Sequence, residues 1–394
     1  MSTLGYIFSL IAYPILINKF GLRAVGEIFT IQAVVLIAAS IANYSFAYYI
    51  PIVSKRVTDD EKYVVKLWNL VLHIRTFFSI LFGLILTVGV YYFYKESFLI
   101  LAFSLPLLLS KIINPVLFCN ALEINKYVFK IGFFSKLLFL LLILVTTRSY
   151  LVNFFLALSE LVVILFYLKR IHIGLYSLRL ISFYEIKQFL RQTFNLFLVN
   201  TLLVLKPNAI LPAVSLLLGF EFAALFLLAQ KIINIIKSTS ATVFISFFPI
   251  YSKDDFSLNI ISTKRIVIAL FTSLLIVLAF WILSPYFIYY LNDFNNSLPA
   301  TKTLQIMSLS IPVFFMIIPL FSYLLKHRKW AAILTFSIVQ LLVLITTLYL
   351  FIDQNIVGVA KSLVISEYTL LICYTIYILK QKRLKANIKS SSLL

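Results

Sequence analysis

Residues 248–253 read FPIYSK, and residues 50–55, almost half the chain earlier, read IPIVSK. The two hexapeptides end a longer repeat that keeps one offset of 198 residues without a gap. The matched pairs are Pro14 and Pro212, Gly21 and Gly219, Gln32 and Gln230, Ser40 and Ser238, Pro51 and Pro249, Ser54 and Ser252, and Lys55 and Lys253. The glycine match carries the most weight, because the whole chain has only 9 glycines. The repeat predicts two parts of one chain with the same local fold.

The amino-acid composition indicates that this chain folds in a lipid bilayer. Of the 394 residues 62% are hydrophobic and only 12% are charged. Apolar runs of about 20 residues, long enough to cross about 30 Å of hydrocarbon, recur along the whole chain. We predict an all-α polytopic membrane protein with about twelve spans. They are residues 3–18, 24–51, 67–94, 98–122, 127–147, 149–168, 190–218, 222–250, 265–292, 301–325, 330–352 and 355–379.

The placement of positive charge predicts the topology. The loops after even-numbered spans and the C-terminal tail hold most of the 34 lysines and arginines. The opposite loops hold only Lys19, Arg23, Lys95, Arg148 and Lys302. Since short cytoplasmic loops are rich in Lys and Arg, both termini are expected in the cytoplasm. The net charge of +20 is spread over short loops, so no nucleic-acid partner is expected.

The two copies of the repeat are separated by six spans. An even number gives the copies the same orientation, related by an axis along the membrane normal, as in transporters with parallel repeats. We therefore expect two parallel six-helix bundles around a central cavity: residues 1–188, and residues 189–394 with a basic cytoplasmic tail. The alternative is that similar proline-terminated hairpins simply recur in membrane proteins.

The stretch from residue 219 to 253, GFEFAALFLLAQKIINIIKSTSATVFISFFPIYSK, resembles the eighth-span signature of the Wzx-type O-antigen flippases. These belong to the superfamily that also holds the MATE exporters and the lipid II flippases. The first hairpin, from Lys19 to Arg56, is similar to that family's opening. The resemblance covers about 70 residues and implies a MATE-like fold. It also implies translocation of undecaprenyl-pyrophosphate-linked oligosaccharide to the periplasmic leaflet, in the service of O-antigen and lipopolysaccharide biosynthesis.

Two features depart from that pattern. Gln230 stands where the family commonly has Glu. The N-terminus is also short, because residue 1 aligns with residue 199 and nothing matches the segment before the seventh span. We expect either a shortened first helix or a start codon further upstream.

Charged residues inside the spans are the candidate site. Seven basic residues lie there: Arg75, Lys111, Lys136, Lys206, Lys231, Lys237 and Lys361. Each would cost about 2.5–3.5 kcal/mol near a bilayer centre, so we expect them to face a wet cavity that binds an anion. Only Glu160 and Glu367 offset them within the spans. The predicted substrate-binding residues are Lys206, Lys231, Lys237, Lys111, Arg75, Asn234 and Gln230.

Each candidate also has a structural interpretation. On the eighth span, Gln230, Asn234 and Lys237 follow helical spacing along one face. The alternative for Lys206 or Lys237 is a structural lysine tied to carbonyl groups, and the alternative for Arg75, Lys136 and Lys361 is extension to the membrane surface. Glu160 and Glu367 are either proton-coupling residues or members of fixed Glu–Lys pairs. Under the cavity hypothesis, Lys237→Ala should leave folding intact or improved.

No enzyme signature, cofactor motif or metal-binding spacing is present in the sequence. The main alternative is a MATE-type multidrug or ion antiporter, whose cavity should be acidic for organic cations. A lipid II flippase and a polysaccharide polymerase are weaker alternatives, since a polymerase should carry a large outer loop. The expected partners are the undecaprenyl-pyrophosphate-linked oligosaccharide and membrane lipids, together with the polymerase and chain-length regulator of the same pathway.

Overall fold

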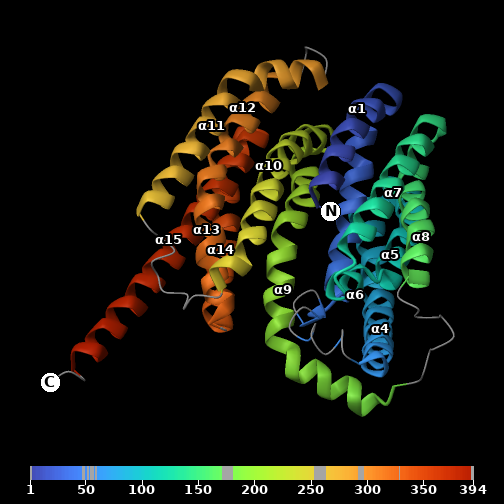
Figure 1. The fold of residues 1–394 in the computed structure, drawn as a ribbon. Coiled ribbons are helices and arrows are strands. Elements are labelled where there is room, and N and C mark those ends of the chain that lie inside the picture. Colours follow the sequence, from blue (N-terminus) through green and yellow to red (C-terminus); the bar gives the residue numbers. More distant parts are fainter. Residues whose placement is uncertain are drawn as a thin grey trace. The chain divides into compact units, whose positions relative to one another are not determined.

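The structure is a computed structural model, and it describes residues 2–46, 49, 50, 53, 57, 60–170, 181–252, 263–291, 297–327 and 329–391. Over these residues the chain is helical, without strands, as predicted (Figure 1). Of the repeated hexapeptides, Pro51, Ser54, Lys55 and Lys253 lie outside the described residues.

Two compact units divide the chain inside one helix, at Leu227 and Leu228. The helices from the first unit are α1 (Ser2–Ala42), α4 (Glu61–Phe93), α5 (Phe98–Ile113), α6 (Val116–Ala121), α7 (Asn125–Val145), α8 (Val152–Arg170) and α9 (Phe183–Leu218). Helix α10 (Phe220–Ser252) contains the division. The second unit continues with α11 (Thr263–Leu291), α12 (Ser297–Ser308), α13 (Ser310–Lys326), α14 (Trp330–Phe351) and α15 (Asn355–Ser391). The boundary at residues 188 and 189 rests on the repeat and stays a prediction.

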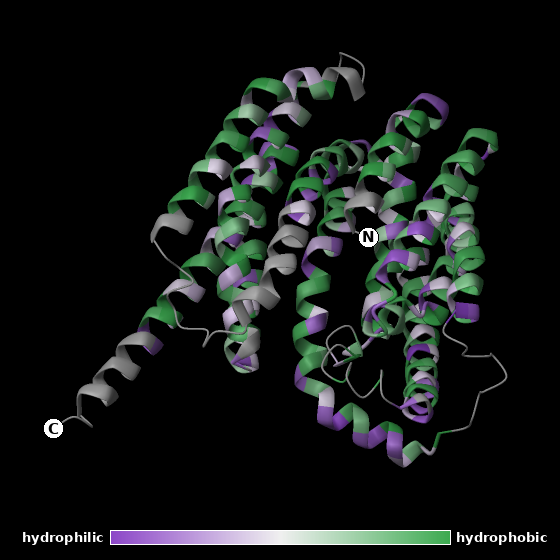
Figure 2. Cartoon of the chain, viewed as in Figure 1, coloured by the Kyte–Doolittle hydropathy of each residue, from purple (hydrophilic) through white to green (hydrophobic). Residues whose placement is uncertain are grey.

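Nine stretches of the described residues are long and apolar enough to cross a bilayer. Most of the length of the helices is hydrophobic (Figure 2). On α4 and α11 large apolar side chains such as Leu84, Tyr92 and Phe271 are more than half exposed. A water-soluble surface rarely tolerates such bands, whereas lipid covers them without cost. The chain is thus a multi-pass membrane protein, and the count of twelve spans stays a prediction.

Gly21 folds α1 back on itself. Its backbone has φ 82° and ψ 164°, which is not helical. The rings of Tyr13 and Phe29 lie 6.4 Å apart, although 16 residues of straight helix would separate them by about 24 Å. The first hairpin of the sequence is therefore present, with a turn of one glycine.

Gly219 makes the same turn in the second copy of the repeat. It ends α9 with φ 97° and ψ 167°, close to the values at Gly21, and α10 begins at the next residue. Both glycines occupy a backbone region that only glycine adopts readily. The constant offset of 198 residues thus relates two equal turns, which supports the repeat at the level of backbone geometry.

We expect Gly219→Ala to destabilise the protein by about 1–3 kcal/mol through backbone strain alone. No atom lies within 4 Å of an added Cβ at Gly219, so steric overlap does not contribute. The matched control is Gly89→Ala in α4, where the space is also open and no positive φ is present. Thermal unfolding in detergent, followed by intrinsic fluorescence, should show a lower Tm for Gly219→Ala and an equal or higher Tm for the control, because alanine is the better helix former. Equal Tm values would contradict the strain argument.

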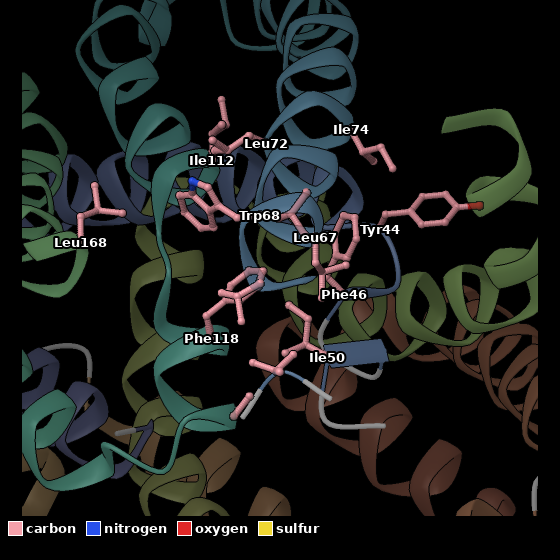
Figure 3. Packing of buried hydrophobic residues seen from close by; sticks show 14 of the residues in the cluster. Tyr44, Phe46, Ile50, Leu67, Trp68, Leu72, Ile74, Ile112, Phe118 and Leu168 are labelled. Atoms are coloured by element: carbon pink, nitrogen blue, oxygen red, sulfur yellow. The ribbon is translucent and has the colours of Figure 1, made fainter. Parts of the chain in front are cut away.

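The core of the first unit brings the ends of several helices together (Figure 3). Trp68 on α4 packs edge-on against Phe118 on α6, with ring centroids 5.3 Å apart. Phe46 stacks on Phe189 of α9 at 5.3 Å. Helix α5 packs between α1, α4 and α8, and α7 packs on α8. This arrangement places the C-terminal turn of α5 beside the middle of α7 and α8.

The second unit is organised around α15. Helices α12, α13 and α14 all pack against it, and α11 packs on α12 and α13. A 3-10 turn, Ile352–Gln354, joins α14 to α15. Ser362 and Ser366 of α15 are fully buried, and each returns its hydroxyl to a carbonyl of its own helix.

Candidate functional site

Three charged side chains meet inside the first unit. Lys111 donates two hydrogen bonds to Glu160, with Nζ 2.8 Å from Oε1 and 2.6 Å from Oε2. Lys136 approaches the same carboxylate, with its Nζ 3.5 Å from Oε1. These residues come from α5, α8 and α7, and we call them the α5–α7–α8 cluster. Two ammonium groups share one carboxylate, so the cluster carries a net positive charge.

Local structure explains why these side chains converge. Lys111 lies in the last turn of α5, which ends at Asn114 because Pro115 follows. A lysine is favourable there, since the carbonyl end of a helix carries partial negative charge. Glu160 also accepts a hydrogen bond of 2.9 Å from the Ser110 hydroxyl. The Glu160 side chain is only 12% exposed, so protein atoms surround most of its carboxylate.

Cavities adjoin the cluster. One of about 310 Å³ is lined by Lys111, Ser135, Lys136 and Glu160 together with residues of α1, α6 and α8. A second of about 160 Å³ shares the three charged residues and reaches Gln32 on α1. A third of about 260 Å³ contains Lys111 and Arg75. Since a liquid water occupies about 30 Å³, these spaces are large enough for solvent and for a small anion.

Arg75 plays a different part from the lysines. Its guanidinium donates to the Asn43 Oδ1 at 2.7 and 3.0 Å, and to the carbonyls of Ile112 and Asn114 at 3.1 and 2.9 Å. Only 3% of Arg75 is exposed, so it does not extend to the membrane surface. These contacts tie the C-terminal end of α5 to the end of the first hairpin. Arg75 thereby holds the turn that presents Lys111, while it also lines the third cavity.

The second unit contains a buried Lys–Glu pair. Lys237 on α10 donates to both oxygens of Glu367 on α15, each at 2.9 Å. Both side chains are largely buried, with 14% and 18% exposed. The ammonium group also lies 5.6 Å from the ring centre of Phe314 on α13, within range of a cation–π contact. This is the fixed Glu–Lys pair that was one of the two interpretations from the sequence.

The other predicted substrate-binding residues lie on α9 and α10 and differ in burial. Lys231 is buried, with 6% exposed, whereas Gln230 and Asn234 are half-buried. Lys206 is half-buried on α9 in the first unit, just before Pro207. Their role in substrate binding stays a prediction.

The sequence predicted that Lys136 faces the cavity but did not include it among the substrate-binding residues. Its partner Glu160 lies on another helix, and only the packing of α7 on α8 brings the two together. Lys361, by contrast, donates to the Gln354 Oε1 at 2.6 Å beside the turn that begins α15. That position fits a lysine at a membrane surface.

Comparison with known proteins gives relatives by fold. No protein-family model matches the sequence, and no curated protein matches it. Among solved structures, the lipid II flippase MurJ in an inward closed conformation aligns with a TM-score of 0.75 at 14% identity, over 95% of this chain and 85% of that chain. A MATE structure in complex with MaL6 aligns with a TM-score of 0.59 at 14% identity, over 98% of this chain and 94% of that one. A MATE complex with MaD3S gives a TM-score of 0.60 at 13% identity, over 98% and 95% of the two chains. At these identities the likeness is one of fold, and the predicted MATE-like fold is confirmed.

Proposed function

We propose that this protein is a flippase for an anionic, lipid-linked substrate. The substrate is undecaprenyl-pyrophosphate-linked oligosaccharide of the O-antigen type, moved from the cytoplasmic to the periplasmic leaflet. The chain acts without enzymatic chemistry, in the bacterial inner membrane and with both termini in the cytoplasm. The observation that carries the proposal is the α5–α7–α8 cluster, which places a net positive charge beside cavities inside a membrane protein.

The cost of burying charge supports an anionic substrate. A lysine within the hydrocarbon region costs about 2.5–3.5 kcal/mol unless water, a carboxylate or another anion offsets it. Glu160 offsets one of the two lysines beside it. The excess charge is favourable for the protein only if the cavity holds solvent or a substrate anion, and a diphosphate provides strong acceptors for ammonium donors.

The sign of the charge argues against export of organic cations. A cation would be repelled by Lys111 and Lys136, so a MATE-type multidrug or ion antiporter is the less favoured alternative. The TM-score is higher for the lipid II flippase MurJ, 0.75, than for the MATE complexes, 0.59 and 0.60. The comparison therefore also favours a lipid as the cargo, and a lipid II flippase is the second alternative.

The substrate contacts are assigned to both units. In the first unit we propose Lys111 and Lys206, with Arg75, which lines the cavity of about 260 Å³ together with Lys111. In the second unit we propose Lys231 and Lys237, supported by the polar side chains on the same helix. The two glutamates are proposed to regulate these lysines by pairing with them. The polymerase and chain-length regulator of the pathway would act on the translocated product.

Deletion of the gene should leave lipid-linked repeat units on the cytoplasmic leaflet and abolish the surface polymer. The reason is that a charged headgroup does not cross the hydrocarbon region at a useful rate without a protein. The measurement is the access of a membrane-impermeant glycosidase to the lipid-linked sugar in spheroplasts, before and after the gene is restored. Normal polymer in a strain without a second flippase would contradict the proposal.

A further inference from the structure

The two lysines that contact Glu160 are held unequally. Lys111 makes two short hydrogen bonds, 2.6 and 2.8 Å, and so uses both carboxylate oxygens. Lys136 makes one contact of 3.5 Å, at the limit of hydrogen bonding. About a quarter of each lysine side chain is exposed, 29% and 25%, and both border the 310 Å³ cavity. Lys136 can therefore bind an anion in the cavity at the loss of one weak contact to Glu160, whereas Lys111 would lose two short hydrogen bonds.

The residue next to Lys136 contributes a second polar group to that cavity. Ser135, the neighbour of Lys136 on α7, is only 4% exposed. Its hydroxyl makes no hydrogen bond among the described residues, although it lines the same cavity. A buried donor without an acceptor costs about 1–3 kcal/mol, so this position favours an acceptor from outside the protein. A phosphate oxygen satisfies both the Ser135 hydroxyl and an ammonium group.

We infer that the first unit contains its own binding site for a phosphate or diphosphate group, formed by Ser135 and Lys136, and that the Glu160 carboxylate competes with this anion for the lysines. The inference rests on the proposed function, because it takes the anion to be the phosphate part of the cargo. Lys111 holds Glu160 from the end of α5 through two short hydrogen bonds, in addition to its proposed contact with the substrate. When the anion enters, Lys136 exchanges a carboxylate for a phosphate oxygen. When the anion leaves, Glu160 takes Lys136 back, which prevents the site from retaining its cargo.

The exchange predicts an unusual result for Glu160→Gln. Loss of the competing carboxylate should raise the affinity for inorganic pyrophosphate about tenfold, which corresponds to about 1.4 kcal/mol. The binding is measured by isothermal titration on the purified full-length chain in detergent. Adding Lys136→Met to Glu160→Gln should remove the gain, and Ser135→Ala should reduce the wild-type affinity about threefold. The matched control is Glu96→Gln, because that carboxylate is 83% exposed and pairs with Arg23 away from the cavity.

Stability separates this role from a structural one. Glu160→Gln leaves two lysines without their carboxylate, so its Tm should fall, and pyrophosphate should restore it by more than it raises the wild-type Tm. If the glutamine variant does not fold, Glu160→Asp retains the charge but shortens the reach, and it should give a smaller gain of the same sign. A folded variant with unchanged or weaker pyrophosphate binding would overturn the inference and make Glu160 a structural counter-ion. A gain seen with phosphatidylglycerol vesicles but not with pyrophosphate would overturn it as well.

The proposed function can fail separately. If Glu160→Gln binds pyrophosphate more tightly but the wild-type chain does not move a lipid-linked oligosaccharide, the anion site stands and the cargo is wrong. If the wild-type chain moves the lipid and the variant shows no gain in affinity, the cargo stands and the competition is wrong.

Discussion

Lys237→Ala is expected to destabilise the second unit by about 3 kcal/mol, because it removes the buried ammonium group that donates to both oxygens of the Glu367 carboxylate. This reverses the expectation from sequence, in which a costly lone lysine was removed and folding stayed intact or improved. Both side chains are more than four-fifths buried, so water cannot replace the lost partner. The Tm in detergent, followed by fluorescence-detected size exclusion, should fall by several degrees.

The double variant Lys237→Ala with Glu367→Ala should recover most of that loss, because no charge is then left buried alone. Transport is expected to respond differently from stability. It should fall in Lys237→Ala, persist in part in Lys237→Arg and vanish in Lys237→Glu, since the last change repels an anion. A Lys237→Glu protein that reaches the membrane at a normal level and still supports surface polymer would make Lys237 a purely structural residue.

Gly26→Ala should strongly destabilise the first unit. A Cβ at Gly26 would overlap the carbonyl oxygen of Phe220 and would lie 2.7 Å from its carbonyl carbon. The opposing atoms are backbone, so they cannot rotate away as a side chain does. Overpacking usually costs about 1–3 kcal/mol, and this overlap should exceed that range. Most of the protein should be lost from the monodisperse peak in size exclusion.

Two positions serve as controls for Gly26. At Gly83 an added Cβ meets only Leu108 Cδ2 at 3.4 Å, an ordinary contact, so Gly83→Ala should keep a normal yield. The residue equivalent to Gly26 in the second copy of the repeat is Ala224, which is fully buried. Alanine is therefore compatible with this part of the hairpin, and only the approach of Phe220 excludes it. A normal yield of Gly26→Ala would show that α1 and the start of α10 are not in this contact.

The fold was predictable because the bilayer imposes simple rules. Apolar runs of about 20 residues cross hydrocarbon as helices, because a helix satisfies its own backbone hydrogen bonds. The paired glycines predicted two equal turns, and the backbone angles of Gly21 and Gly219 confirm them. The site was less predictable. The sequence gives the number of buried charges, but the identity of each partner depends on how helices pack. The contact between Lys136 and Glu160 joins the successive helices α7 and α8, and the contact between Lys237 and Glu367 joins α10 and α15, which are far apart in the sequence.

The sequence predicted the partners of the buried glutamates in part. Two interpretations were open for the glutamates, and the geometry gives the Glu–Lys pairs. For Arg75 the alternative of extension to the membrane surface is excluded, because the carbonyls of Ile112 and Asn114 and the Asn43 side chain accept its hydrogen bonds inside the first unit. A helix end that lacks backbone partners attracts an arginine, and only the three-dimensional position of that end reveals it.

Reconstitution tests the central claim most directly. The purified chain is placed in proteoliposomes with a fluorescent undecaprenyl-pyrophosphate-linked oligosaccharide, and a membrane-impermeant quencher reports the lipid that reaches the opposite leaflet. Wild-type protein should move this lipid, whereas Lys111→Met, which weakens the positive charge of the cavity, should move it far more slowly. Translocation of lipid II in its place, or export of an organic cation without any movement of the oligosaccharide lipid, would contradict the account.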